Sequence, residues 1–225
     1  MAPKLGYNIP NGSTLQIAET MGDAITVTGI SNATEAVATA TGAGIDALSP
    51  GDYIMLSVDW VNLNGLVCRI KAATEGAITL EGVDTSDVNM FPAGGGVGEL
   101  VKIEKWIDLP LTPTIANAGN EQQTTTFQAI QMERAATINT FKSAATQTFT
   151  MAHDATHAAR KVLKALDRSQ DPTAFKMYNK RAKETRLYGC QVSFNELPAS
   201  EVNNVETNTL VLNLISDMQI YPDAN

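Results

Sequence analysis

The sequence predicts a mainly β protein of the α+β kind, with a single α-helix packed against its strands. Residues 1–110 are rich in Thr, Val, Ile and Gly and place turn residues at intervals of about ten, which is typical of an all-β module. The second half alternates apolar and polar residues on both sides of one stretch with helical periodicity. Together these patterns predict short strands, one packed helix and more strands.

Length and composition limit how this fold can be built. With 225 residues, of which 44% are hydrophobic and 18% charged, the chain can bury a core, and disorder throughout is excluded. The length accommodates one large domain, or one domain with an inserted module of about 80 residues. No window approaches the roughly 18 consecutive apolar residues of a membrane-spanning helix. The segment Met1–Asn8 also lacks the apolar region of a signal peptide, so we expect neither membrane insertion nor export.

Short strands are expected through the first half. They are Thr14–Ala18, Asp23–Ile30, Asp52–Ser57, Leu66–Ala72, Ala77–Glu81 and Leu100–Asp108, joined by turns rich in Gly, Pro and Asn. Residues 31–44 are rich in Ala and Thr and fit either a strand pair or a short helix.

The glycine-rich segment Phe91–Gly98 resembles a phosphate-binding loop, in which backbone amides cradle an anion. It has no Gly-Lys-Ser/Thr ending, and a predicted strand follows it where a phosphate loop requires a helix. We therefore predict a surface turn.

Residues 110–126 are predicted to form a long loop. Two prolines, Pro110 and Pro113, precede a polar stretch that has no apolar face. Structureless connections longer than about 12 residues are usually functional or become ordered against a partner. This segment is therefore a candidate assembly element.

Residues 154–168 carry the clearest helical pattern. Apolar residues recur at spacings of three and four from Ala155 to Leu166, and Asp154 is placed to cap the first turn. The polar face carries the cations Arg160, Lys161, Lys164 and Arg168, which complement the C-terminal end of the helix dipole. Strands are expected around this helix at Phe149 and Met151, Phe175–Tyr178, Glu184–Asn195 and Leu210 to Ile220, with one face buried and a basic hairpin tip at Asn179–Lys183.

His153 and His157 have the spacing of two zinc ligands on one turn of a helix, with Asp154 where a zinc protease carries its glutamate. If Asp154 caps the helix, His153 lies outside it, and the two rings cannot project from one face. We therefore expect these residues to form the polar beginning of the helix and not a metal site. No catalytic, metal-binding or cofactor-binding residues are predicted, and Cys68 and Cys190 are expected to be buried free thiols.

Charge is distributed unevenly along the chain. Residues 1–100 hold 3 Lys or Arg and 11 Asp or Glu, whereas residues 101–225 hold 13 of each sign, so the whole net charge of −8 belongs to the first half. An acidic surface repels phosphate, which disfavours tight nucleic-acid binding.

The order of six segments resembles the major tail tube proteins of long-tailed, siphovirus-like bacteriophages. The segments are Gly51–Ser57, Leu80–Thr85, Phe91–Gly98, the strand around Trp106, Gly119–Gln123 and Gln191–Glu196. They span most of the chain, and it is their joint order that carries the resemblance. The sequence departs from the family pattern at Asn179–Ala182, where relatives carry an Asn-Gly turn, and in the histidine-containing stretch before the helix.

The resemblance implies a tail tube β-sandwich of two antiparallel sheets with one flanking α-helix. Residues 1–22 and 105–225 would form this core, with the helix at 154–168, and residues 23–104 would form an inserted small β-barrel on the outside of the tube. It implies a structural virion protein without enzymatic activity or cofactor. The protein would form homohexamer rings that stack into a tail tube and conduct the genome DNA into the host without binding it specifically.

The same resemblance implies further partners and contact residues. The other tail proteins would be the tape measure, tail terminator and distal tail proteins, and the tail would be assembled in the host cytoplasm. Inter-ring contacts are expected at Pro110, Pro113, Asn117, Asn120, Glu121 and Gln122, and Glu121 and Glu133 are expected to face the lumen. Because DNA must slide, Lys180, Arg181, Lys183 and the helix cations are expected to face away from it. The alternative is a β-rich surface-binding or decoration module, which would carry exposed aromatic platforms.

Overall fold

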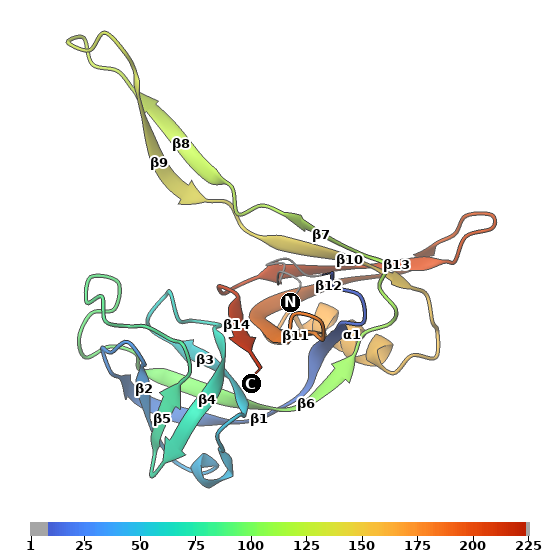
Figure 1. Ribbon diagram of the computed structural model, residues 1–225, viewed down its shortest axis with the longest axis horizontal. Coiled ribbons are helices and arrows are strands. Elements are labelled where there is room, and N and C mark those ends of the chain that lie inside the picture. Colours follow the sequence, from blue (N-terminus) through green and yellow to red (C-terminus); the bar gives the residue numbers. More distant parts are fainter. Residues whose placement is uncertain (1–8, 224–225) are drawn as a thin grey trace, which may run out of the picture.

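The computed structural model describes residues 9–223 and confirms a mainly β fold with one α-helix (Figure 1). The predictions for Met1–Asn8 and for the last two residues of the core lie outside the described residues. The strands are β1 (Thr14–Ile30), β2 (Val37–Thr41), β3 (Tyr53–Val58), β4 (Val67–Thr74), β5 (Ala77–Leu80), β6 (Gly98–Asp108), β7 (Thr114–Ala118), β8 (Gln122–Phe127), β9 (Ala136–Lys142), β10 (Thr146–Ala152), β11 (Thr173–Asn179), β12 (Glu184–Ala199), β13 (Thr207–Leu214) and β14 (Gln219–Pro222). The helix α1 spans Ala159–Ser169.

Strands β1, β2, β5, β4, β3 and β6 pair in a closed circuit, because β1 is paired with β2 on one side and with β6 on the other. This circuit, called the barrel below, encloses a cluster of fully buried side chains that includes Ile54, Leu56 and Ile78. Trp60 and Phe91 close one end with their rings 5.2 Å apart. Closure leaves the barrel without open strand edges.

The core sheet continues from the other ends of β6 and β1 through β11, β12, β13, β10 and β7. Its buried face carries Phe149, Phe175 and Tyr188, whose rings pack in series at 5.2 and 4.9 Å. The helix α1 covers this face with Ala159 and Leu163, which are buried in the same cluster. The alternating apolar residues of β12 and β13 were therefore a correct indication of a half-buried sheet.

A third cluster joins the barrel to the core sheet. Val67 of the barrel packs with Leu187 of the core sheet and with Tyr221 of β14, which pairs with the beginning of β12. The Tyr221 hydroxyl accepts the N–H of Arg69 at 3.1 Å and donates to the Glu81 carbonyl at 3.0 Å. Arg69 also lies over the Tyr221 ring, 4.7 Å from its centre, and pairs with the Glu81 carboxylate. The C-terminal strand thus ties both parts of the fold together.

The first strand is longer than the sequence predicts. Thr14–Ala18 and Asp23–Ile30 belong to the single strand β1, which passes from the core sheet into the barrel through register shifts between Ala18 and Ala24. The undecided segment 31–44 contains the strand β2.

The predicted helix start at Asp154 is wrong, since α1 begins at Ala159. The Asp154 carboxylate accepts the backbone N–H and the hydroxyl of Thr156 and so closes a turn. These hydrogen bonds lower the pKa of Asp154. Met218 and Ile220, predicted on a buried face, are exposed.

The predicted long loop at 110–126 is also wrong. It contains β7, which pairs with β10, and β8, which pairs with β9. The segment is therefore extended and hydrogen-bonded.

Candidate functional site

The most prominent feature of the surface is a β-hairpin that projects from the body of the molecule (Figure 1). It consists of β8, β9 and the connecting residues 128–135, and is called the arm below. The two strands form a separate sheet and pair only with each other within residues 9–223. An isolated two-stranded hairpin is at best marginally stable in water. The arm therefore lacks the support that the other strands have.

The arm leaves the core sheet at a hydrogen-bonded joint. Gly119 adopts φ 77° and Asn120 adopts φ 60°, both in the left-handed region. A side chain at Gly119 would place its Cβ 1.8 Å from the Ala144 carbonyl oxygen, so only glycine fits. The Asn120 N–H donates to the Ser143 carbonyl at 3.1 Å, and the Glu121 N–H donates to the Ser143 hydroxyl at 3.0 Å. The joint sets the direction of the arm.

The arm carries large apolar side chains that nothing in a single copy covers. Phe127 is 57% exposed, Phe141 is 67% exposed and Ile130 is fully exposed, and Ile138 is exposed as well. Scattered single apolar residues are ordinary on a surface, but a cluster on a thin projection indicates a contact surface.

The core sheet has a second face with no charged residue on β12, β13, β10 and β7. Strand alternation places these residues opposite Val192, Leu210 and Phe149, which point into the core. The residues of this uncharged face are Gln191, Ser193, Asn195, Thr209, Val211, Asn213, Thr146, Thr148, Thr150, Thr114, Ala116 and Ala118. All are exposed or half-buried. The cations of α1 lie on the opposite side, where Arg160 covers the ring of Phe194.

The two edges of the uncharged face differ. Beyond Cys190 the edge of β12 is covered by α1, because the Asp167 carboxylate accepts the Phe194 N–H at 2.9 Å and Arg160 donates to the Glu196 carbonyl at 3.3 Å. Lys164 pairs with the Glu196 carboxylate at 2.6 Å, and this bond lowers the pKa of Glu196. The other edge, β7, ends the sheet without a further strand among the described residues. An open edge can pair with another chain.

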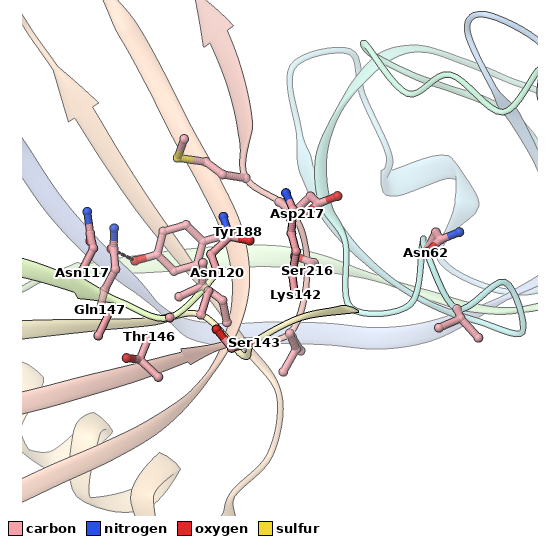
Figure 2. Close-up of a pocket in the computed structure, with 17 residues that line it drawn as sticks. Asn62, Asn117, Asn120, Lys142, Ser143, Thr146, Gln147, Tyr188, Ser216 and Asp217 are labelled. Atoms are coloured by element: carbon pink, nitrogen blue, oxygen red, sulfur yellow. Dashed lines mark hydrogen bonds between the residues drawn. The ribbon is translucent and has the colours of Figure 1, made fainter. Parts of the chain in front are cut away.

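A groove of about 570 Å³ lies where the arm meets the core sheet (Figure 2). One wall is formed by the loop of the barrel that carries Val61 and Asn62, and the other by residues of β7, β10 and the arm joint. Tyr188 donates a hydrogen bond to Gln147 at its floor, and burial raises the pKa of the Tyr188 hydroxyl. Lys142 and Asp217 are the charged residues among those that line it.

The predicted contact residues fall into separate places. Asn117 and Asn120 come together in the groove, and Glu121 and Gln122 lie next to them at the beginning of the arm. Pro110 and Pro113 lie at the other end of β7, and Glu133 lies in the loop at the far end of the arm.

The glycine-rich segment does not offer its amides to an external anion. The carboxylate of Asp59 accepts the N–H groups of Gly96 and Val97 at 2.7 and 3.0 Å. An internal carboxylate thus occupies the position that a phosphate would take, and the segment closes the barrel end.

The two histidines each make hydrogen bonds to nearby groups of the chain. His153 Nδ1 lies 2.6 Å from the amide oxygen of Asn208, and the His157 ring accepts the N–H of Ala159. Within residues 9–223, no group of three or more His, Cys, Asp or Glu residues is arranged to hold a metal ion. No helix in the same range combines the length and apolar character needed to cross a membrane.

Sequence reasoning missed the apolar residues of the arm and the exposed hairpin tip between β12 and β13. The arm residues Phe127, Ile130, Ile138 and Phe141 are spaced by 3, 8 and 3 positions, which is not the alternation of a strand. The available signal was the presence of these large apolar residues, together with Met132, in a stretch rich in Gln, Thr and Ala.

The chain is similar in sequence to a known protein family. The sequence model of the phage tail tube protein family, TTP, matches residues 58–222, which is more than half of the chain. No curated protein matches the chain. Among solved structures, a chain of the cryo-EM structure of the anti-feeding prophage (AFP) baseplate, 6-fold symmetrised, is 12% identical, with a TM-score of 0.36 over 53% of this chain and 86% of that chain. A similarity of this size is too weak to define a shared fold.

Proposed function

This chain belongs to the phage tail tube protein family, and on that premise we propose that its copies form hexameric rings that stack into the tube through which the genome DNA leaves the virion. The family is one of structural proteins, and the protein is a structural component of a phage tail. The proposal adds the ring, the stacking and the passage of DNA.

The arm is the observation that carries the proposal. It projects from the body, is held at a fixed joint, and exposes Phe127, Ile130, Ile138 and Phe141 to water. A second copy that covered these side chains would remove the cost of their exposure. The arm, which begins at Gln122, and the adjoining Glu121 therefore make the contact with the neighbouring ring, together with Asn117 and Asn120 at the arm base.

The uncharged face supports the proposed conduit. Sliding DNA requires a wall without clustered cations, because phosphate contacts release counterions and hold the duplex in place. The uncharged face of β12, β13, β10 and β7 meets this requirement, and the α1 cations lie behind it. We assign this face to the lumen. Glu121 and Glu133 would reach the lumen only where the arm crosses the inner wall of the neighbouring ring.

The barrel would lie on the outside of the tube. Residues 23–104 would be the external module, since the barrel closes on itself and leaves the core sheet to form the ring. The net charge of this part is strongly negative, which suits a solvated outer surface. The tape measure, tail terminator and distal tail proteins would contact the inside and the two ends of the tube.

Negative-stain electron microscopy of arm variants tests the proposal. Wild-type protein should form rings or hollow filaments, whereas the double variant Ile130→Asp/Phe141→Asp should stay monomeric at the same concentration. Val88→Asp/Met90→Asp is the matched control, because Val88 and Met90 are 56% and 53% exposed on the barrel. The control should assemble normally.

Two results would contradict the proposal. One is a wild-type protein that stays monomeric at every concentration and solution condition tested. The other is an arm variant that forms tubes as readily as the wild type. A cryo-EM map with a net positive inner wall would refute the lumen assignment specifically.

A further inference from the structure

The hairpin between β12 and β13 ends in a preformed, exposed knob. Its connecting residues 200–206, called the tip below, are ordered by their own hydrogen bonds. Ser200 donates to the Glu206 carboxylate at 2.7 Å, and the Asn204 side chain donates to the Glu201 carboxylate at 2.7 Å. The tip therefore has a defined shape in the single copy.

The tip exposes apolar and acidic side chains together. Val202 is 84% exposed and Val205 is 74% exposed, and the neighbouring Leu197 is exposed as well. Glu201 and Glu206 form no ion pair among the described residues, and the tip carries no cation. Such a knob fits a cavity that offers apolar walls and a positive charge.

The groove at the arm base offers both. Val61, Leu214, Ile215 and Met218 supply apolar walls. Lys142 forms no ion pair within residues 9–223 and supplies a positive charge, while Asp217 is the acidic residue of the lining. Asn62, Ser143 and Ser216 add side chains that can pair with the polar groups of the tip, as the labelled residues in Figure 2 show. A volume of about 570 Å³ holds the apex of a hairpin but not a whole strand.

Tip and groove lie at opposite ends of the same strands. The pairing Thr146↔Asn213 lies at the groove, and the pairing Ala152↔Thr207 lies at the tip. Because the two surfaces are different and face opposite ways along the strands, a contact between them is heterologous and repeats from copy to copy. In a single copy the tip cannot reach its own groove.

We propose that the tip of one copy docks into the groove of the next copy along the strand direction, with Val202 and Val205 against the apolar wall and Glu201 near Lys142. The proposal rests on the proposed function, because the partner is a second copy in an adjacent ring. This stacking contact lies at the base of the arm, apart from the exposed apolar side chains Phe127, Ile130, Ile138 and Phe141.

The geometry sets a length for the repeat. Asn203 at the apex and Leu214 at the groove are 11 residues apart in an extended hairpin, which corresponds to about 37 Å. Strand tilt shortens this value along the tube axis. The axial repeat should therefore be about 37 Å or less.

Disulfide cross-linking tests the contact. The variant Asn203→Cys/Asn62→Cys places one thiol on the tip and one on the groove wall. The native Cys68 and Cys190 are fully buried, and burial raises the pKa of the Cys68 thiol to about 12, so they give little background. Mild oxidation of assembled protein should give a ladder of covalent multimers that disappears on reduction.

Matched controls separate this contact from general proximity. Asn203→Cys/Asn89→Cys, with the second thiol on an exposed loop of the barrel, should give no ladder. Tubes without a ladder from the tip-and-groove pair would overturn this inference and leave the proposed function standing. A wild-type protein that never assembles would overturn both.

Charge reversal gives an independent measurement. Lys142→Glu and Glu201→Lys should each raise the concentration needed for assembly about fivefold, and the double variant should restore it to within about twofold of the wild type. Equal effects in all three variants would also overturn the docking contact.

Discussion

Replacing Tyr221 with Phe is expected to loosen the junction between the barrel and the core sheet. The Tyr221 side chain is buried, and its hydroxyl bonds to the N–H of Arg69 and to the carbonyl of Glu81, both in the barrel. Its strand β14 pairs with β12 of the core sheet. One hydroxyl group thus serves a contact between two parts of the fold.

The magnitude follows from what the substitution removes. Phenylalanine keeps the ring, and with it the packing on Val67 and the stacking of Arg69. Only the two hydrogen bonds are lost, which leaves a part-buried N–H and a part-buried carbonyl without this partner. An unpaired buried group costs about 1–3 kcal/mol, so we expect about 2 kcal/mol in the free energy of unfolding, or a fall in Tm of about 4–8 °C.

Urea and thermal unfolding followed by circular dichroism measure this change. Tyr178→Phe is the matched control, because the Tyr178 hydroxyl donates to Asp223 at 2.7 Å but is not buried. The control should change the free energy of unfolding by less than about 0.5 kcal/mol. Equal effects of Tyr221→Phe and Tyr178→Phe would refute the role assigned to the buried hydroxyl.

Three further predictions concern pH, the arm joint and the thiols. Pairing with arginine lowers the pKa of Glu81, so its stabilising contribution is complete above the ordinary glutamate pKa and is lost as pH falls through the lowered value; the urea midpoint of Glu81→Gln should therefore vary less with pH in this acidic range than that of the wild type. Gly119→Ala should abolish assembly seen by microscopy, because its methyl group meets a backbone carbonyl, whereas Gly12→Ala, at a similar positive φ in open space, should not. Cys68 and Cys190 should react with a thiol reagent only after unfolding, because burial raises both pKa values; rapid reaction in the native protein would contradict this.

Strands with one buried face were predictable from the sequence. In β12, Cys190, Val192 and Phe194 alternate with Gln191 and Ser193 because one side meets the core and the other meets solvent. Apolar and polar residues alternate where one face of a strand is buried. The pattern therefore predicts strands whose face is buried within a single copy.

The arm was not predictable for the same physical reason. Both faces of β8 and β9 are exposed in a single copy. The run Thr124, Thr125 and Thr126 therefore shows no alternation of apolar and polar residues. The prolines and polar residues before β8 therefore indicated a loop. The predicted helix start was too early because Ala155 and Ala158 have the apolar spacing of a helix. Both residues lie before Ala159, where the helix begins.

The groove could be predicted only in part. Asn117 and Asn120, which stay predicted assembly contacts, line the groove. Tyr188 of β12 and Ile215, which follows β13, come from parts of the chain that are distant in sequence from Asn117. They meet only because β12, β13 and β10 pair. No local pattern encodes such a meeting.

Some sheet edges of this fold are covered and others are open, and this difference affects where further copies could add. The barrel has no open edge, and α1 covers the edge of β12 that pairs with no strand, through Asp167 and Arg160. The strand β7, the arm and the groove are left uncovered, and they adjoin one another. A protein that blocks some of its sheet edges restricts pairing to the edges that remain, which suppresses random aggregation while permitting a defined polymer. If the chain assembles as proposed, the helix directs that assembly by closing an edge. Weakening its contact with β12 should then produce irregular aggregates rather than loss of association.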